Sequence, residues 1–349
     1  MRILITTFAF APSIGGMETA AEILARGLTS RGHAVTVVTS TPGSHEADNF
    51  PFKVVRQPSR GELLRLVREN DAVWQNHISL RLLWPLLIVR RPLVIMHHLV
   101  LETDVGSGPE HGWLKRLACK LGTNAFASEA LQKAARLPGP VIYNAYDSET
   151  FYPRLDVSRD RDIVFLGRLR TYKGPDILID AIAQLARSGV RPRATMIGGG
   201  PEDTALKAQA DAAGVADLIT FTGPLRGDAL ARQLSAHRVM AIPSRGEEAF
   251  AITALEGMAC GCVVVGTQSG GVPEAIGPCG PIVPQDDPTA LAMALQTLLH
   301  NDALYARYKN AIPAHLEKFT VTTLLDASEA LLKSVAHKAG GHSAPTRSF

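Results

Sequence analysis

Two acidic residues, Glu248 and Glu256, stand eight positions apart in the stretch of sequence that is richest in reactive groups. They follow a predicted strand at residues 239–242, and a helix is expected to begin near Ala249. On such a helix, residues eight apart lie about 80° apart around the axis and about 12 Å along it. Glu248 would then lie at the helix mouth, beside a ligand. Glu256 would lie two turns deeper in an apolar run, where a carboxylate is costly unless it meets a hydroxyl or a cation. The alternative for Glu248 is an acidic residue favoured only by the helix dipole.

A second group of reactive side chains is basic. Gly167, Arg168 and Lys173 follow a predicted strand at residues 162–166, and a helix with proline at its start is predicted at 175–188. Two cations beside a strand end, with a helix N-terminus behind them, make a site for a diphosphate. The alternative is an ordinary solvated basic loop.

Glycine pairs follow two further strands. Gly15 and Gly16 come after the strand predicted at 2–7, and Gly198 and Gly199 come after a later one. Glycine lets the backbone approach a ligand closely, and open parallel sheets bind ligands beyond the carboxyl ends of their strands. Turns with flexible glycines are the alternative interpretation. Neither loop has the GxGxxG pattern, which disfavours an NAD-dependent dehydrogenase.

Strands and helices alternate along both halves of the chain and must position these loops. The first half has predicted strands at residues 2–7, 33–40, 71–75, 93–97, 125–128 and 141–144. The second half has predicted strands at residues 162–166, 193–197, 218–221, 239–242, 263–266 and 281–283. A polar, proline-containing stretch at 152–162 is the expected linker. This alternation predicts an α/β protein with two Rossmann-like domains built on parallel sheets.

The whole-chain composition excludes several classes of protein. The chain has 349 residues, enough for two domains, with 46% hydrophobic and 20% charged residues, which is a globular composition. The net charge of +3 comes without a basic arm, so no nucleic-acid partner is expected. No run of about 18 apolar residues predicts a membrane span. Four scattered cysteines favour reduced thiols in a cytoplasmic protein.

Taken together, these motifs resemble the retaining glycosyltransferases of family 4, also called glycosyl transferases group 1. The matching segments are residues 15–18, 165–169 with 173–174, 198–201, 221–223, 248–261 and 270–274. The segment 248–261 resembles the Glu-x7-Glu signature of that family, and the resemblance extends from residue 1 to about residue 338. It implies the GT-B fold, in which two Rossmann-like domains face each other across a cleft.

The resemblance also implies a division of labour along the chain. Residues 1–153 would form the acceptor-binding domain, and residues 154–318 the domain that binds the nucleotide sugar. A helix at 319–338 would pack back on the first domain. Residues 339–349, rich in Gly and Ser, are expected to be a disordered tail.

The family's donor-binding residues can be carried over position by position. Arg168 and Lys173 match the residues that hold the donor diphosphate, and Glu256 matches the acid that accepts hydrogen bonds from the ribose hydroxyls. Glu248 matches the acid near the transferred sugar. The remaining expected donor-binding positions are Gly167, Gly198, Gly199, Phe250, Ala251 and Ile252.

On the side of the first domain, Gly16, together with Gly15, matches the loop that closes over the diphosphate. The family often has a histidine at the end of a strand near the reacting sugar, and His97 or His98 matches it, with His97 favoured by register. Either could instead be a structural histidine.

The mechanism implied by the resemblance needs neither a cofactor nor a metal ion. Arg168 and Lys173 would stabilise the departing diphosphate in place of a metal. Anomeric configuration would be retained by front-face attack, with the leaving phosphate taking the acceptor proton. The Asp-Arg-Asp at 160–162 lies before a strand, so it is interpreted as solvated surface.

The expected function is transfer of a sugar from a UDP- or GDP-sugar to a hydroxyl of a glycan, a glycolipid or a small molecule. A nucleotide-sugar epimerase and a non-catalytic sugar-nucleotide binding protein are the alternatives. Residues 81–91 mix apolar residues with arginines and could touch an anionic bilayer at the inner membrane face. A core helix is the preferred interpretation of that run. The nucleotide, the sugar, the acceptor and the oligomeric state stay open.

Overall fold

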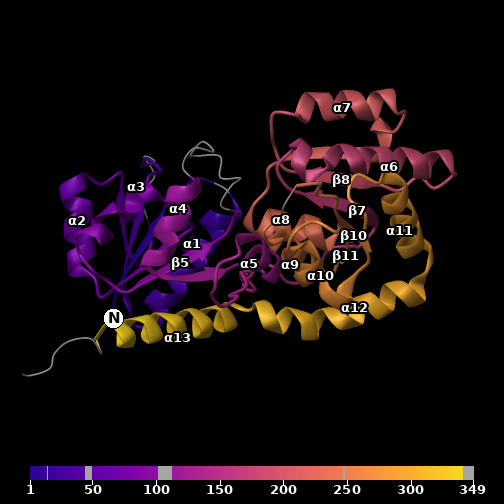
Figure 1. The fold of residues 1–349 in the computed structure, drawn as a ribbon. Helices are drawn as coiled ribbons and strands as arrows, with labels where there is room; N and C mark the ends of the chain where they lie inside the picture. The colour runs from indigo at the N-terminus through magenta and orange to yellow at the C-terminus, as the bar shows by residue number, and fades with distance from the viewer. Residues whose placement is uncertain (14, 44–48, 101–111, 247, 341–349) are drawn as a thin grey trace, which may run out of the picture. The chain divides into compact units, whose positions relative to one another are not determined.

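The computed structural model describes residues 1–13, 15–43, 49–100, 112–246 and 248–340. The chain forms two compact units (Figure 1). The first unit comprises Met1–Ala145 together with the C-terminal segment from Val321, and the second comprises Tyr146–Thr320. The sequence had suggested a division after residue 153.

The first unit is built on one parallel sheet with the strand order β3-β2-β1-β4-β5-β6. Its strands are β1 (Arg2–Thr7), β2 (Ala34–Thr39), β3 (Lys53–Arg56), β4 (Ala72–Asn76), β5 (Leu93–His97) and β6 (Thr123–Phe126). Every residue of β4 and β5 is buried. Parallel strands that are covered on both faces are mostly apolar, and the apolar residues of these two strands made them visible in the sequence.

Helices cover both faces of the first sheet. They are α1 (Gly16–Ser30), α2 (Arg60–Glu69), α3 (Leu80–Leu83), η1 (Trp84–Leu87), α4 (Gly112–Ala118), η3 (Cys119–Leu121), α5 (Glu129–Ala135) and α13 (Val321–Gly340). One apolar cluster joins α2, α3 and α4 to the strands through residues such as Leu63, Leu82 and Ala118.

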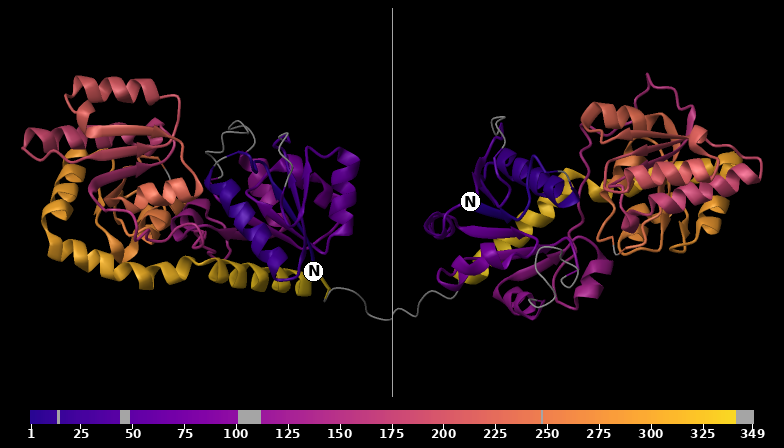
Figure 2. Two further views of the ribbon diagram at one scale, coloured as in Figure 1. Left: turned by 180° about the vertical axis from the view of Figure 1, so that it is seen from behind. Right: turned by 90° about the horizontal axis from the view of Figure 1, so that it is seen from above.

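The C-terminal helix α13 packs against α1 and β5 of the first unit (Figure 2). Gly27 of α1 permits this approach, because a Cβ there would lie 2.5 Å from a methyl carbon of Leu325. Arg31 pairs with Asp326 at 2.7 Å, and His33 contacts Glu329 at 3.1 Å. Charged contacts at the helix edge therefore accompany the apolar ones.

The second unit has a parallel sheet with the order β12-β11-β10-β7-β8-β9. Its strands are β7 (Arg161–Leu166), β8 (Ala194–Ile197), β9 (Ile219–Gly223), β10 (His237–Ile242), β11 (Val263–Thr267) and β12 (Ile282–Val283). Its helices are η4 (Thr171–Lys173), α6 (Pro175–Arg187), α7 (Asp203–Ala212), η5 (Ala216–Leu218), α8 (Gly227–Ser235), α9 (Ile252–Ala259), α10 (Val272–Ile276), η6 (Gly277–Cys279), α11 (Pro288–His300), α12 (Asp302–Leu316) and η7 (Glu317–Phe319). The predicted α/β architecture with two parallel sheets is confirmed.

Two strand predictions need correction. The strand expected at 141–144 is wrong, because Val141 forms only an isolated bridge to Phe126 before pairing ends. The strand expected at 125–128 ends at Phe126, because Ser128 caps α5 by accepting a hydrogen bond from the Leu131 amide. The short strand β3 was missed in the sequence.

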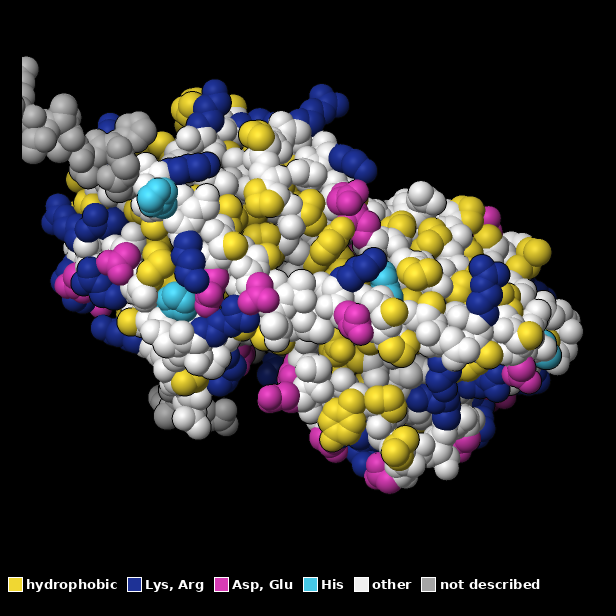
Figure 3. All heavy atoms as spheres, turned by 90° about the horizontal axis from the view of Figure 1, so that it is seen from below, with side chains coloured by type: hydrophobic (Ala, Val, Ile, Leu, Met, Phe, Trp, Pro, Cys, Tyr) yellow, Lys and Arg dark blue, Asp and Glu magenta, His cyan; other side chains and the backbone are white. Residues whose placement is uncertain are grey.

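On the face of the molecule shown in Figure 3, lysine and arginine side chains are interspersed with acidic and apolar ones. The short run at 81–91 is divided between core and surface. Leu82 and Leu83 are buried, whereas Leu87 and Ile88 are 71% and 62% exposed. In the described part of the chain, no helix is both long and apolar enough to cross a membrane.

Candidate functional site

The loops after β7 and β10 of the second unit meet at the carboxyl edge of the sheet. Lys173 Nζ lies 2.5 Å from Glu248 Oε2, and the two side chains are 22% and 16% exposed. The Ser244 hydroxyl donates to the same carboxylate oxygen at 3.3 Å. Two of the side chains chosen from the sequence are therefore in direct contact, in a place that solvent and ligands can reach.

The predicted start of the following helix was wrong. Helix α9 begins at Ile252, not near Ala249, so Glu248 lies in the preceding loop. The reason is tertiary: the Gly271 amide donates to the Glu248 carbonyl at 2.7 Å, which ties this residue to the loop after β11. Gly270 has a φ of 47°, and a Cβ there would lie 2.1 Å from the same carbonyl oxygen. Glycine is required for this close approach.

Glu256 lies in the second turn of α9 and is half-buried. Burial, followed by the negative charge of Asp147, raises the pKa of its carboxyl to about 7. None of the residues that the structure describes forms a hydrogen bond or an ion pair with the side-chain carboxylate of Glu256. A carboxylate in this setting is stabilised by hydroxyl donors, so the site fits a ligand that supplies them.

Arg245 is a central residue of this site that the sequence analysis missed. Its guanidinium makes a bidentate pair with Asp176 of α6 at 3.1 and 2.9 Å. It also contacts Asp286 at 2.6 Å and donates to the Thr171 carbonyl at 3.0 Å. Arg245 thus joins the loop of Glu248 to the turn η4 that carries Lys173. Its partners lie far from it in sequence, so spacing gave no signal.

The turn η4 is anchored from a second side by Glu202. The Thr171 amide and hydroxyl both donate to Glu202 Oε1, at 2.8 and 2.7 Å. The amide of Arg245 donates to the Tyr172 carbonyl at 3.0 Å. Lys173 therefore stands on a turn whose backbone is held on both sides.

The glycines after β7 and β8 bring these two loops together. Gly198 has a φ of 143°, and a Cβ there would lie 1.8 Å from the Gly167 carbonyl oxygen. Gly199 has more room, since its Cβ would make an ordinary contact with Pro224 at 3.6 Å. Arg168 is exposed on the same loop as Lys173. Backbone packing therefore accounts for Gly198, and the basic loop lies at the same sheet edge as Glu248.

Phe250, Ala251 and Ile252 are buried at the start of α9. The ring of Phe250 packs against Phe319, with centroids 5.5 Å apart. These side chains belong to the core, so only their backbone groups are suited to contact a ligand.

In the first unit, Asn76 connects the start of α1 to His98. The Asn76 amide nitrogen donates to the Met17 carbonyl at 3.0 Å, and its oxygen lies 2.8 Å from His98 Nε2. Gly15 and Gly16 stand where α1 begins. Asn76 therefore links His98 to the helix start where these two glycines lie. No sequence motif indicated this asparagine.

His97 and His98 occupy different environments. His97 is fully buried in β5, with Nε2 2.9 Å from Asn124 Oδ1 and its ring stacked on Phe126 at 5.0 Å. His98 follows the strand and is 5% exposed. Burial lowers the pKa of His97 to about 4 and that of His98 to about 3. Both imidazoles are neutral at pH 7, so they act as hydrogen-bonding groups rather than as charges.

The Asp-Arg-Asp segment lies at the opposite edge of the second sheet. Asp162 accepts a hydrogen bond from the Arg193 amide at 2.8 Å at the amino end of β7, and Asp160 is exposed. Asp160 is exposed as expected, whereas Asp162 lies within β7 and is half-buried. In the part of the chain that the structure describes, no three His, Cys, Asp or Glu side chains are grouped to hold a metal ion.

Comparison with known proteins gives a consistent result. The family model described as "Glycosyl transferases group 1" matches residues 160–301, which include the loops of Lys173 and Glu248. The D-inositol 3-phosphate glycosyltransferase of Corynebacterium jeikeium is 33% identical over 171 residues, 46% of this chain and 41% of that protein. The chain thus matches about two fifths of the length of that relative. The GDP-mannose-dependent alpha-(1-6)-phosphatidylinositol monomannoside mannosyltransferase of Mycobacterium tuberculosis is 29% identical over 326 residues, 79% of this chain and 82% of that protein.

Solved structures with the same fold cover nearly the whole chain. Alr3699/HepE of Anabaena in complex with UDP matches with a TM-score of 0.78 and 25% identity, over 96% of this chain and 100% of that chain. Sucrose-phosphate synthase from Thermosynechococcus elongatus matches with a TM-score of 0.80 and 19% identity, over 97% and 100%. The chain therefore has the GT-B fold, and its residues 160–301 match the family model of the glycosyl transferases group 1.

Proposed function

We propose that this protein is a retaining glycosyltransferase that moves a sugar from a UDP- or GDP-sugar to a hydroxyl acceptor without a metal ion. The observation that carries the proposal is the contact between Lys173 and Glu248, next to the basic loop of Arg168. It lies within the segment that matches the family model.

In this proposal, Lys173 and Arg168 bind the donor diphosphate. Breaking the bond between the anomeric carbon and the phosphate oxygen leaves negative charge on the diphosphate, and fixed cations stabilise that charge in the transition state. The Lys173 ammonium has three N–H donors. It can therefore contact a phosphate oxygen while it keeps its ion pair with Glu248. The hydrogen bonds of Arg245 and Glu202 to the turn η4 hold it ready before the donor binds.

Glu256 would accept hydrogen bonds from the ribose hydroxyls of the donor. The residue is half-buried, and a pair of hydroxyl donors would compensate for the hydration that its carboxyl loses. Glu248, placed four residues before α9, would lie near the transferred sugar.

Retention would follow from attack on the same face of the sugar from which the diphosphate leaves. The acceptor oxygen bonds to the anomeric carbon, the bond to the phosphate oxygen breaks, and the acceptor proton passes to that oxygen. We favour His98 over His97 as the histidine of the site, because His98 lies beyond the strand and contacts Asn76 beside the start of α1. As a neutral imidazole it would position a hydroxyl group. Trapping of a covalent glycosyl-enzyme would contradict this mechanism.

The names of similar proteins support both donor nucleotides. The Anabaena structure is described with UDP-glucose, whereas the mycobacterial relative is named as GDP-mannose-dependent. The relatives' names refer to inositol phosphate and phosphatidylinositol compounds as acceptors. For this chain we propose an acceptor with several hydroxyl groups. The acceptor is either a soluble polyol or the polyhydroxy head group of a lipid.

The first test is thermal unfolding with UDP, GDP, ADP or NAD, each added alone in the presence of EDTA. A ligand at a hundred times its Kd stabilises the folded state by about 2.7 kcal/mol, which gives a measurable rise in Tm. We expect a shift with UDP or GDP, which Arg168→Ala abolishes. Arg191→Ala, on the same unit and paired with Asp217 at the surface, is the matched control.

A shift with NAD alone, or no shift with UDP and GDP, would contradict the proposal. The stereochemistry of the reaction is then measured by proton NMR during slow hydrolysis of the donor. The sugar released first should keep the anomeric configuration of the donor. Conversion of the bound donor to an epimer would identify an epimerase instead.

A further inference from the structure

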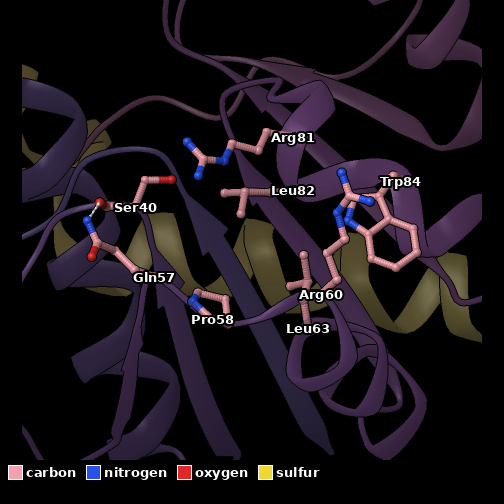
Figure 4. A pocket seen from close by; sticks show the side chains of 8 residues that line it. All are labelled: Ser40, Gln57, Pro58, Arg60, Leu63, Arg81, Leu82 and Trp84. Carbon is pink, nitrogen blue, oxygen red and sulfur yellow. Dashed lines mark hydrogen bonds between the residues drawn. The ribbon is translucent and has the colours of Figure 1, made fainter.

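A cavity in the first unit shares no residue with the candidate donor site or with the contacts of His97 and His98 (Figure 4). It has a volume of about 590 Å³ and lies beyond the carboxyl ends of β2 and β3, between α2 and α3. Cavities of about 300–1,000 Å³ hold small molecules rather than single ions. Its most polar lining residues are Ser40, Gln57, Arg60 and Arg81.

In the part of the chain that the structure describes, no carboxylate pairs with the two arginines of this cavity. Arg60 begins α2 and Arg81 lies in α3, and both side chains are exposed. In Figure 4 the Arg81 guanidinium points toward Ser40, and the Arg60 guanidinium is drawn over the ring of Trp84 at one side of the cavity. Within the described ranges, neither forms a hydrogen bond or an ion pair. Other arginines of this unit, Arg2, Arg26, Arg31 and Arg65, pair with carboxylates. Because arginine side chains are positively charged, a bound anion would balance the charge at this cavity.

The rest of the lining offers hydrogen bonds and apolar surface. Gln57 has a φ of 47°, and its side-chain amide donates to the Ser40 carbonyl at 3.2 Å, which joins the ends of β3 and β2. The Gln57 side-chain oxygen and the Ser40 hydroxyl bond to no described residue. Leu63 and Leu82 are buried at the base, and Trp84 is half-buried at one side. A ligand with an anionic group and several hydroxyls matches this lining better than an inorganic ion.

We propose that this cavity binds the phosphate-bearing head group of the acceptor, with Arg60 and Arg81 holding the phosphate. The inference rests on the proposed glycosyltransferase function, because it assigns the acceptor to the unit that contains His98. The cavity opens at the carboxyl edge of the same sheet from which His98 extends. The phosphate belongs either to a soluble phosphorylated polyol or to a lipid head group of the same chemistry.

The test compares three variants, Arg60→Gln, Arg81→Gln and Arg68→Gln. Arg68 is the matched control, because it is exposed near the other end of α2 and its side chain bonds to no described residue. Calorimetry measures binding of inositol 3-phosphate and of unphosphorylated inositol. Sedimentation measures binding to vesicles of phosphatidylinositol in phosphatidylcholine, against phosphatidylcholine alone. UDP and GDP thermal shifts are recorded for every variant.

We expect phosphate-dependent binding that falls about tenfold or more in Arg60→Gln and in Arg81→Gln, since each removes a charge-assisted hydrogen bond. Arg68→Gln should bind like the wild type. Binding of the soluble phosphate assigns a soluble acceptor, and binding of the vesicles alone assigns a lipid. Equal binding of inositol, unchanged binding in both cavity variants, or no binding of either phosphate form would overturn the proposal. Nucleotide shifts that persist in the cavity variants would show that the donor assignment stands by itself.

Discussion

The two units have equivalent sheets but different chemistry at their carboxyl edges. Read from β9 to β12, the second sheet repeats the strand order of the first, so β1 corresponds to β7 and β4 to β10. In the second unit, charged pairs join the loops after β7 and β10, namely Lys173 with Glu248 and Arg245 with Asp176. In the first unit, the link between the equivalent regions is neutral and runs through Asn76 and His98.

Under the proposed function, this difference reflects the adaptation of one topology to two substrates. A diphosphate leaving group needs fixed cations, and ion pairs and hydrogen bonds hold Lys173 in place before the ligand arrives. In the first unit, the neutral histidines lie in the interior, and the arginines at the cavity pair with no carboxylate among the described residues. We therefore expect substitutions in the second unit to impair chemistry and donor binding, and those in the first to impair acceptor use.

The largest effect is expected for Lys173→Ala. Loss of a preorganised charge at the leaving group should lower turnover by about 100- to 1,000-fold. Donor hydrolysis or transfer, measured at saturating donor, reports this loss. Lys207→Ala serves as the control, because Lys207 pairs with Asp203 on the surface of the same unit. If Lys173→Ala kept wild-type turnover, Lys173 would not contact the leaving group.

Arg245→Ala should have the next largest effect, through position rather than contact. It leaves Asp176 and Asp286 without their cation and frees the turn of Lys173, so donor affinity should fall about tenfold. The free energy of unfolding should fall by about 1–2 kcal/mol. Arg245→Lys keeps the charge but cannot make the bidentate pair, so we expect only partial rescue. Full activity in both variants would remove Arg245 from the site.

The pH dependence of donor binding tests Glu256. Its pKa is raised to about 7, so the charged form, which under the proposed function accepts the ribose hydrogen bonds, increases between pH 6 and pH 8. Donor affinity should therefore rise with pH and level off above the pKa, and Glu256→Gln should flatten the profile. Titration of UDP and GDP binding across this range measures it. A profile that is flat in the wild type would place the ribose elsewhere.

The raised pKa of Glu256 also predicts how the free energy of unfolding depends on pH. Folding raises the Glu256 pKa from its ordinary value of 4.5, so the folded state binds more protons than the unfolded state between about pH 4.5 and pH 7. The contribution of this group to stability is present below that window and is lost as the pH rises through it. Comparison of Tm against pH for the wild type and Glu256→Gln isolates the difference.

The smallest effect on chemistry is expected in the first unit, where His97 and His98 can be compared directly. His98→Ala should lower transfer about tenfold with little change in donor binding, because it removes one hydrogen bond near the reacting groups. His97→Ala should mainly lower Tm, since it leaves a space beside Phe126 and an unpaired Asn124. If His97→Ala lost transfer while keeping its Tm, the assignment would be reversed.

The sequence was sufficient for the repeated α/β architecture and for the loops of the second unit. Strands β1 and β5 were predicted with their observed bounds, because parallel strands buried on both faces are continuous apolar runs. Lys173 and Glu248 could be selected because each lies in a loop after a strand. In a parallel sheet, such loops meet at one edge whatever their separation along the chain.

Tertiary structure alone decided which side chains meet at those edges. Arg245 forms ion pairs with Asp176 and Asp286, which are far from it in sequence. Asn76 forms hydrogen bonds with both Met17 and His98. The Gly271 amide binds the Glu248 carbonyl, and helix α9 begins only at Ile252. No local pattern encodes these events, because hydrogen bonds between loops depend on backbone positions that only the packed sheets define.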